Sequence, residues 1–271
     1  MEVLKMSQNS NLVSLIAELL HKTKGEIKIH SQNVEKSELI INEILSGLQN
    51  HERPDAFTLT EDVCYILEHF EFDSAGSNRK GSTLRAESAR IERTHKEITG
   101  EAVKNPPTNN DGVHEVTFQD EYNITHSAGN YIKNALLNAQ NHYDKIDEYI
   151  PNLKDSMAIG DKLMKVGFFI EDKTLLGNMH FKRDKENPFG KTTPVYLCNT
   201  KQFLDWFEQA EKLDFCFCSS NHGMSHIVWY IDRGLIEEYR KHEIDMDISE
   251  LIDFQPKVHG FSVIFDEGEK Q

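Results

Sequence analysis

The chain has 271 residues, of which 38% are hydrophobic and 28% are charged, a composition that excludes a disordered protein and indicates a folded one with a sizeable core. Its 30 basic and 45 acidic residues give a formal net charge of −15, which argues against nonspecific coating of nucleic acid. No apolar run approaches the roughly 18 residues of a membrane span, and the first residues lack a signal-peptide pattern, so we expect a cytoplasmic protein without a membrane partner.

Two amphipathic helices are predicted at the start of the chain. Apolar residues recur at helical spacing over residues 11–22 and again over about 34–49, which indicates helices that each pack on one side. Residues 31–33 offer N-cap side chains for the second helix. The segment 1–33 is therefore expected to be an N-terminal helical region that precedes the main core.

A β-hairpin is predicted next. Pro54 ends helical structure, and the β-rich runs 55–60 and 63–72 are separated only by Glu61 and Asp62, a spacing that predicts a two-residue turn. The turn fixes the register of the hairpin, in which the numbers of opposed residues sum to 123.

Residues 74–112 change in composition toward Gly, Ser, Asn and basic residues, with a helix predicted from about 82 to 98 and a loop over 106–112. Between Arg79 and Lys104, seven basic residues stand against four acidic ones, a local charge of +3 in an acidic chain. Such a segment is typical of a solvated surface insertion, and it could also bind along the phosphate backbone of a nucleic acid. The residues expected to bind nucleic acid are Arg79, Lys80, Arg85, Arg90 and Arg93.

The second half alternates helices and strands, which predicts an α/β fold with a mixed central sheet flanked by helices. A long helix is expected over about 121–148, ending before Pro151, and a buried strand over 165–172. We expect residues 34–172 to form the core around the insertion 74–112, and 173–271 to form an α/β extension packed on the same core. Within this extension the sequence predicts strands over 194–198, 214–220, 226–232 and 261–270 and a helix over 200–213.

The hairpin brings two acidic residues together. In the predicted register Asp55 faces Glu68, and opposed residues of antiparallel strands lie on one face with Cβ atoms about 5 Å apart. Two carboxylates at that distance could share a hard divalent cation, which would relieve their repulsion. Glu68 otherwise lies on an apolar face of its strand, where an unpaired charge is costly. Glu43, at the edge of the apolar stripe of the second helix, is a third acidic candidate.

The order of a helix, a hairpin with Pro54-Asp55 and Glu68-His69-Phe70, a helix and a strand resembles the core of the PD-(D/E)XK nuclease superfamily over about residues 34–172. The resemblance implies a restriction-endonuclease-like core and metal-dependent phosphodiester hydrolysis of DNA, with RNA as the other nucleic-acid partner. It assigns Asp55 and Glu68 as ligands of Mg²⁺ or Mn²⁺ and Glu43 as a residue that helps to orient the site. The bound ion would lower the pKa of a water molecule and neutralise the scissile phosphate.

The sequence departs from the family at Phe70, which stands where the motif has a lysine that positions the attacking water and stabilises negative charge. Lys80 or its neighbour Arg79 could supply a basic group if the chain folds back, and Lys80 is counted among the catalytic candidates. His69 is adjacent in sequence, but strand alternation places it on the opposite face.

Two other hypotheses stay open beside the nuclease. Phe70 and the charge of −15 favour a catalytically inactive nuclease-like fold that acts as a nucleic-acid- or protein-binding regulatory module. The third hypothesis is an acidic protein-interaction partner that binds no nucleic acid. Metal binding together with DNA cleavage would support the nuclease. DNA binding without a metal would support the regulatory module.

Weaker signals are explained more simply as structural features. His222 and His226 are four residues apart, as in metal sites on helices, but the glycine between them and the strand-like flanks favour a loop. Glu171 and Asp172 end a strand and could reach the same end of the sheet as the hairpin acids, although acids commonly end strands. The cysteines fit neither a zinc ribbon nor a disulfide framework, so we expect reduced core residues at Cys64, Cys198, Cys216 and Cys218.

Overall fold

The computed structural model describes residues 11–78, 81–104, 113–121, 127–157, 159–174, 180–182, 193–222, 225–246, 251–253 and 258–266. The chain divides into two compact units, one formed by 1–74 with 128–254 and the other by 75–127 with 255–271. The sequence-based division into 1–33, 34–172 and 173–271 follows chain order and does not coincide with these units, because strand pairing joins the insertion to the C-terminal segment.

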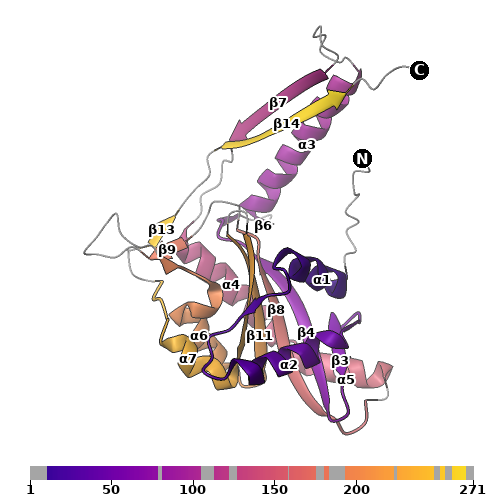
Figure 1. Ribbon diagram of the computed structural model, residues 1–271, viewed down its shortest axis with the longest axis vertical. Coiled ribbons are helices and arrows are strands. Elements are labelled where there is room, and N and C mark those ends of the chain that lie inside the picture. Colours follow the sequence, from indigo (N-terminus) through magenta and orange to yellow (C-terminus); the bar gives the residue numbers. More distant parts are fainter. Residues whose placement is uncertain are drawn as a thin grey trace. The chain divides into compact units, whose positions relative to one another are not determined.

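The first unit is built on a seven-stranded mixed sheet with the order β1-β12-β11-β8-β4-β3-β2 (Figure 1). β2, β3 and β4 form an antiparallel meander, whereas β4, β8 and β11 are parallel and therefore need long crossover connections. The predicted α/β class with a mixed sheet flanked by helices is confirmed. The strands are β1 (Ile27–Lys28), β2 (Gln49–Asn50), β3 (Ala56–Leu59), β4 (Val63–Phe72), β8 (Leu163–Asp172), β11 (Phe215–His222) and β12 (Ser225–Asp232).

Helices cover both faces of this sheet (Figure 1). On one face, the Thr58 hydroxyl donates to the carbonyl of Ile44 and ties α2 to β3. On the other face, α4 packs against β4, where the ring of His142 stacks on Phe70. The helices of this unit are α1 (Leu12–Lys22), α2 (Val34–Ser46), α4 (Ala128–Tyr143), α5 (Ile146–Ser156), η1 (Leu197–Asn199), α6 (Lys201–Gln209), η2 (Arg233–Leu235) and α7 (Ile236–Arg240).

Smaller sheets complete the two units. The first unit also contains the three-stranded sheet β10-β9-β13, and the second contains one long helix, a short hairpin and a two-stranded antiparallel sheet. The strands of the three-stranded sheet are β9 (His180–Lys182), β10 (Thr193–Pro194) and β13 (Leu251–Asp253). The elements of the second unit are β5 (Ser77–Asn78), β6 (Gly81–Ser82), α3 (Thr83–Lys104), β7 (Val113–Glu121) and β14 (Val258–Asp266).

The predicted register of the hairpin is confirmed. Ala56 pairs with Leu67, and Leu59 pairs with Cys64, so opposed positions sum to 123 as expected from a two-residue turn. The turn is closed by the amide of Thr60, which donates to the carbonyl of Val63 at 2.9 Å. A shift of one residue would have moved every side chain of β3 to the other face of the sheet.

The first two helices begin where the sequence predicts. The Asn11 side chain accepts a hydrogen bond from the amide of Ser14 at 2.9 Å, and the Asn33 side chain accepts one from Lys36 at 3.2 Å, which is the N-cap arrangement. α2 ends earlier than predicted, at Ser46, because residues 49–50 leave the helix and pair with β3 as an edge strand.

The predicted helix over 121–148 is wrong at both ends. Residues 113–121 form β7, α4 begins only at Ala128, and a separate helix, α5, then continues through Pro151. Pro151 removes one backbone donor from α5. The helix persists because its apolar side is buried as far as Leu153, and tertiary packing of this kind contributes most of a helix's stability.

Other boundaries differ less. Only Pro194 of the predicted strand 194–198 lies in a strand, and the chain then turns as η1, where the Asn199 side chain accepts from the amide of Tyr196 at 2.8 Å. The helix predicted over 82–98 extends to Lys104 as α3. The predicted loop 106–112 lies outside the described residues.

The core of the first unit lies on both faces of the central sheet. Its largest fully buried side chains are phenylalanines and tyrosines of β8, β11, β12 and the helices that cover them. All four cysteines are free and buried, as predicted. Within the described part of the chain, no helix is both long and apolar enough to cross a membrane.

Gly167 in β8 allows an aromatic ring to approach the backbone. A Cβ atom at this position would lie 2.1 Å from a ring atom of Phe215, the residue that pairs with Gly167 across the parallel ladder. The Phe215 ring is itself 2% exposed and lies edge-on to Tyr65 at 6.1 Å. A side chain at residue 167 would therefore displace a packed ring.

We expect Gly167→Ala to lower the free energy of unfolding by about 1–3 kcal/mol, the usual cost of overpacking a core. Urea unfolding followed by tryptophan fluorescence measures it. If the ring of Phe215 is the obstacle, adding Phe215→Leu should make the double variant more stable than the sum of the two single losses predicts. Strictly additive losses would contradict this explanation.

Candidate functional site

The structure brings Asp55 and Glu68 together at the open end of the β3–β4 hairpin. The amide of Asp55 donates to Glu68 Oε2 at 3.3 Å, and Asp55 Oδ2 accepts a hydrogen bond from the amide of His69 at 2.8 Å. Pro54, which precedes them, follows a cis peptide bond and is buried. The two carboxylates thus lie side by side on one face of the sheet, with Glu68 only 9% exposed and Asp55 partly buried.

Two residues from the covering helices complete this cluster. His142, near the end of α4, places its Nδ1 3.1 Å from Glu68 Oε1, and the Tyr149 hydroxyl of α5 donates to the same oxygen at 3.0 Å. We call Asp55, Glu68, His142 and Tyr149 the hairpin cluster. The described residues include no lysine or arginine that forms an ion pair with either acid.

The electrostatics of the hairpin cluster reflect two acids with little compensating charge. Burial first, and then the nearby charge of Glu68, raise the pKa of Asp55, although the His69 amide acts in the opposite direction. Burial and the Glu68 carboxylate also raise the pKa of Tyr149, so its hydroxyl remains a hydrogen-bond donor at neutral pH. A cation placed between the two acids would remove the main source of repulsion.

Phe70 supports the histidine of this cluster. It lies on the same face of β4 as Glu68, and its ring stacks on His142 with centroids 5.0 Å apart and planes 21° apart. Phe70 therefore orients an imidazole supplied by α4. Sequence reasoning did not identify His142 or Tyr149, although both continue the buried stripes of their helices, as Tyr131, Ala135 and Ala139 show for α4.

Glu43 does not join the other predicted catalytic acids. Its carboxylate accepts a hydrogen bond from the Tyr65 hydroxyl at 2.9 Å, and Tyr65 is three positions from Glu68 on β4, so the two point to opposite faces. The prediction failed because sequence alone does not say which face of the sheet a preceding helix covers. Lys80 and Arg79 lie outside the described residues.

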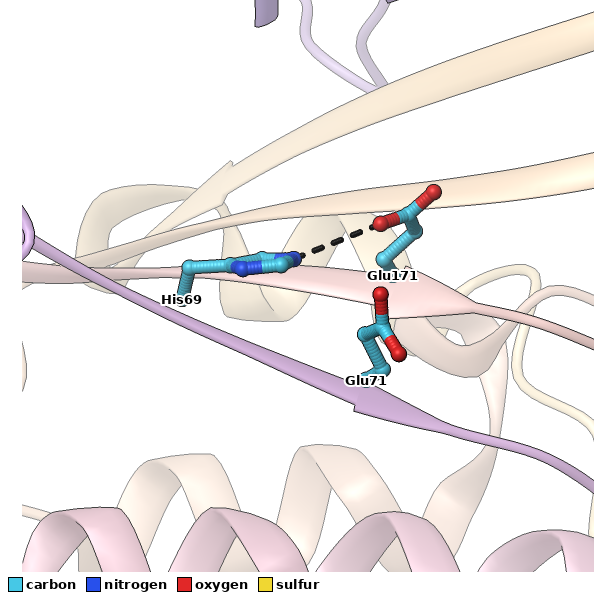
Figure 2. A group of neighbouring side chains, drawn as sticks. All are labelled: His69, Glu71 and Glu171. Carbon is cyan, nitrogen blue, oxygen red and sulfur yellow. Dashed lines mark hydrogen bonds and ion pairs between the residues drawn. The ribbon is translucent and has the colours of Figure 1, made fainter. Parts of the chain in front are cut away.

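A second polar cluster occupies the opposite face of β4. Figure 2 shows His69 and Glu71 from β4 pointing toward Glu171 of β8, with the His69 ring 3.3 Å from the Glu171 carboxylate. One ligand atom from each of the three side chains lies within 4.8 Å of the others. Lys173 adds an ammonium group 2.5 Å from Glu171 and 3.6 Å from Glu71. Sequence reasoning had placed Glu171 at this end of the sheet but not on this face.

The basic residues of the insertion lie on α3 in the second unit. Arg85 and Arg93 are exposed, whereas Arg90 forms an ion pair with Glu87 at 2.8 Å and Lys96 forms one with Glu92 at 2.6 Å. Pairs three or four residues apart are usual on an exposed charged helix. They reduce the positive charge that α3 can offer to a phosphate backbone.

His226 lies on strand β12, not on a helix, so the spacing of His222 and His226 does not form a helical metal site. Burial and nearby Lys22 lower the pKa of His226, and the carboxylate of Glu171 partly opposes this shift. His226 therefore belongs to the charged surroundings of the second cluster.

Comparison of the chain with protein-family models, with curated proteins and with solved structures gives no match.

We expect Asp55→Asn to raise the free energy of unfolding at pH 7. Because the pKa of Asp55 is raised on folding, its ionised form is less favourable in the folded chain than in the unfolded one. This cost is fully present above the raised pKa and disappears as the pH falls below the ordinary value of 3.8. Asparagine can still accept the His69 amide.

Chemical unfolding of both proteins between pH 7 and pH 4 tests this expectation. The stability difference between variant and wild type should shrink as the pH falls. A difference that does not change with pH would mean that ionisation of Asp55 does not affect stability, and a variant less stable than wild type at pH 7 would show that Asp55 is held as a stabilising charge.

Proposed function

We propose that this protein is a metal-dependent phosphodiesterase that cleaves DNA, with the hairpin cluster as its active centre. One observation carries the proposal: Asp55 and Glu68 lie side by side on adjacent strands, and the pKa of Asp55 is raised by burial and by the charge of Glu68. Two partly buried acids without a paired cation at the mouth of a hairpin are costly for folding alone.

The donor set fits a hard divalent cation such as Mg²⁺ or Mn²⁺. Both candidate ligands are carboxylates, which these ions prefer, and no hydrogen bond from the described residues engages Asp55 Oδ1. Asp55 and Glu68 would hold the ion. When bound, it would supply Lewis acidity and neutralise charge on the phosphate.

His142 is the residue that would accept the proton of the attacking water. With Nδ1 donating to Glu68, the imidazole keeps its lone pair on Nε2. Glu68 and the stacked ring of Phe70 fix its orientation, as a carboxylate does for a histidine base. Tyr149 donates to Glu68 and holds that carboxylate in place.

The order of elements supports the same conclusion. α2, the meander of β2, β3 and β4, the crossover helices α4 and α5, and the parallel strand β8 follow in the order on which the resemblance to PD-(D/E)XK nucleases rests. A basic group from α4 in place of the lysine at position 70 is consistent with members of the superfamily that move this group to another element.

We expect the full-length protein to cleave DNA in the presence of Mg²⁺ or Mn²⁺ but not with EDTA. Asp55→Asn and Glu68→Gln should each reduce the rate at least about 100-fold, since a catalytic carboxylate or base typically contributes 10²–10⁴-fold. His142→Ala should lose a similar factor and recover part of it with added imidazole. Gel assays on linear, nicked and single-stranded DNA measure this.

Glu43→Gln is the matched control, because Glu43 is an exposed acid on the other face of the sheet and should not affect cleavage. Cleavage of RNA but not DNA would change the proposed substrate, while the hairpin cluster would remain the proposed active centre. Binding of Mn²⁺ and DNA without cleavage would favour the inactive regulatory module, which Phe70 also favours. No binding of metal or nucleic acid would overturn the proposal and leave a protein-interaction partner.

The exposed arginines of α3 are proposed as phosphate contacts. We expect the double variant Arg85→Glu/Arg93→Glu to weaken DNA binding and to lower the slope of log K against log salt by about 2, close to one unit per lost phosphate contact. Fluorescence anisotropy at several salt concentrations measures the slope. An unchanged slope would mean that α3 is an ordinary solvated helix.

A further inference from the structure

The cluster of His69, Glu71 and Glu171 has the dimensions of a metal site. Ligand atoms about 2.1 Å from one tetrahedral ion lie about 3.4 Å apart. His69 Nε2 and Glu171 Oε2 are already 3.3 Å apart, and all three ligand atoms lie within 4.8 Å of one another. Small side-chain rotations would bring the third ligand into place (Figure 2).

Paired strands hold these ligands rigidly. His69 and Glu71 are two positions apart on β4 and therefore share a face, and Glu71 pairs directly with Glu171 in the parallel ladder. Glu171 is 3% exposed, whereas His69 and Glu71 are partly exposed. The site thus has one buried carboxylate at its base and two ligands nearer to solvent, through which an ion could enter.

A separate observation points to a missing ligand at this place. Ser219 of β11 pairs with Glu171 on its other side, so its side chain lies on the same face beside that carboxylate. It is 1% exposed, and its hydroxyl has no hydrogen-bond partner among the residues that the structure describes. Buried hydroxyls are normally satisfied. A water molecule held by an ion at Glu171 would give Ser219 its partner.

Lys173 acts as the present counter-ion of the cluster. Its ammonium group contacts Glu171 at 2.5 Å and lies 3.6 Å from Glu71. The Lys173 side chain is 44% exposed, so it can move into solvent when a divalent ion replaces it.

We propose that His69, Glu71 and Glu171 form a second metal site, which takes a divalent transition metal such as Zn²⁺ in exchange for Lys173. The imidazole ligand favours metals of the Mn²⁺ to Zn²⁺ series over Mg²⁺. The site is distinct from the hairpin cluster, since His69 and Glu68 point to opposite faces of β4. The two sites meet only at the backbone of His69, whose amide donates to Asp55.

The test uses the full chain carrying Asp55→Asn and Glu68→Gln, so that the hairpin cluster cannot supply the signal. Titration calorimetry with Zn²⁺, together with the visible absorption of Co²⁺, should show one bound ion. Adding Glu71→Gln or His69→Gln should weaken binding at least about tenfold. Glu61→Gln, which removes an exposed acid in the hairpin turn, should leave the affinity unchanged.

Lys173→Met distinguishes a metal site from a closed ion-pair network. If the lysine only competes with the ion, its removal should tighten Zn²⁺ binding at least about threefold. If Lys173→Met binds Zn²⁺ with equal or weaker affinity, the proposed exchange of Lys173 for the metal is wrong. If neither Glu71→Gln nor His69→Gln changes the affinity, the proposed metal site is wrong. Because nuclease activity is absent from this background by design, either outcome leaves the proposed function untouched.

Discussion

The antiparallel register of β3 and β4 determines the chemistry available on both faces of the sheet. It places Asp55 opposite Glu68 on one face. His69 and Glu71 lie on the other face of β4 because side chains alternate along a strand, and the parallel ladder of β4 and β8 brings Glu171 beside them. The two-residue turn fixes this register, and a hydrogen bond from the Thr58 hydroxyl of β3 to a carbonyl of α2 supports it. A shift of β3 by one residue would move Asp55 to the other face of the sheet, away from Glu68.

The two faces deal with their buried acids differently. Glu68 accepts a hydrogen bond from Tyr149 and contacts His142. These contacts do not cancel the repulsion between Glu68 and Asp55, and the pKa of Asp55 is raised by burial and by this neighbouring charge. Burial also acts to raise the pKa of Glu171, but hydrogen bonds from His69 and Lys173 outweigh it and lower the pKa. Among the described residues, no lysine or arginine pairs with the acids of the first face, whereas Lys173 pairs with those of the second.

Local signals in the sequence were enough to predict the hairpin and the first two helices. The turn length set the register, and the N-cap side chains expected within 31–33 include Asn33, which caps α2. The partners of Glu68 could not be found in this way, because His142 and Tyr149 reach it through a crossover whose packing depends on contacts distant in sequence. The prediction that Glu43 joins Asp55 and Glu68 was wrong for a related reason, since helical periodicity identifies a buried stripe but not the face of the sheet that it covers.

Phe70 packs where β4 faces the helix layer that carries His142. The residue is 5% exposed and lies against the helix-covered face of β4, where a lysine would have to bury its ammonium group at considerable cost. The aromatic ring avoids this cost and instead stacks on His142. Phe70 of β4 and His142 of α4 therefore form one arrangement, in which the imidazole beside Glu68 comes from the helix layer and not from the strand.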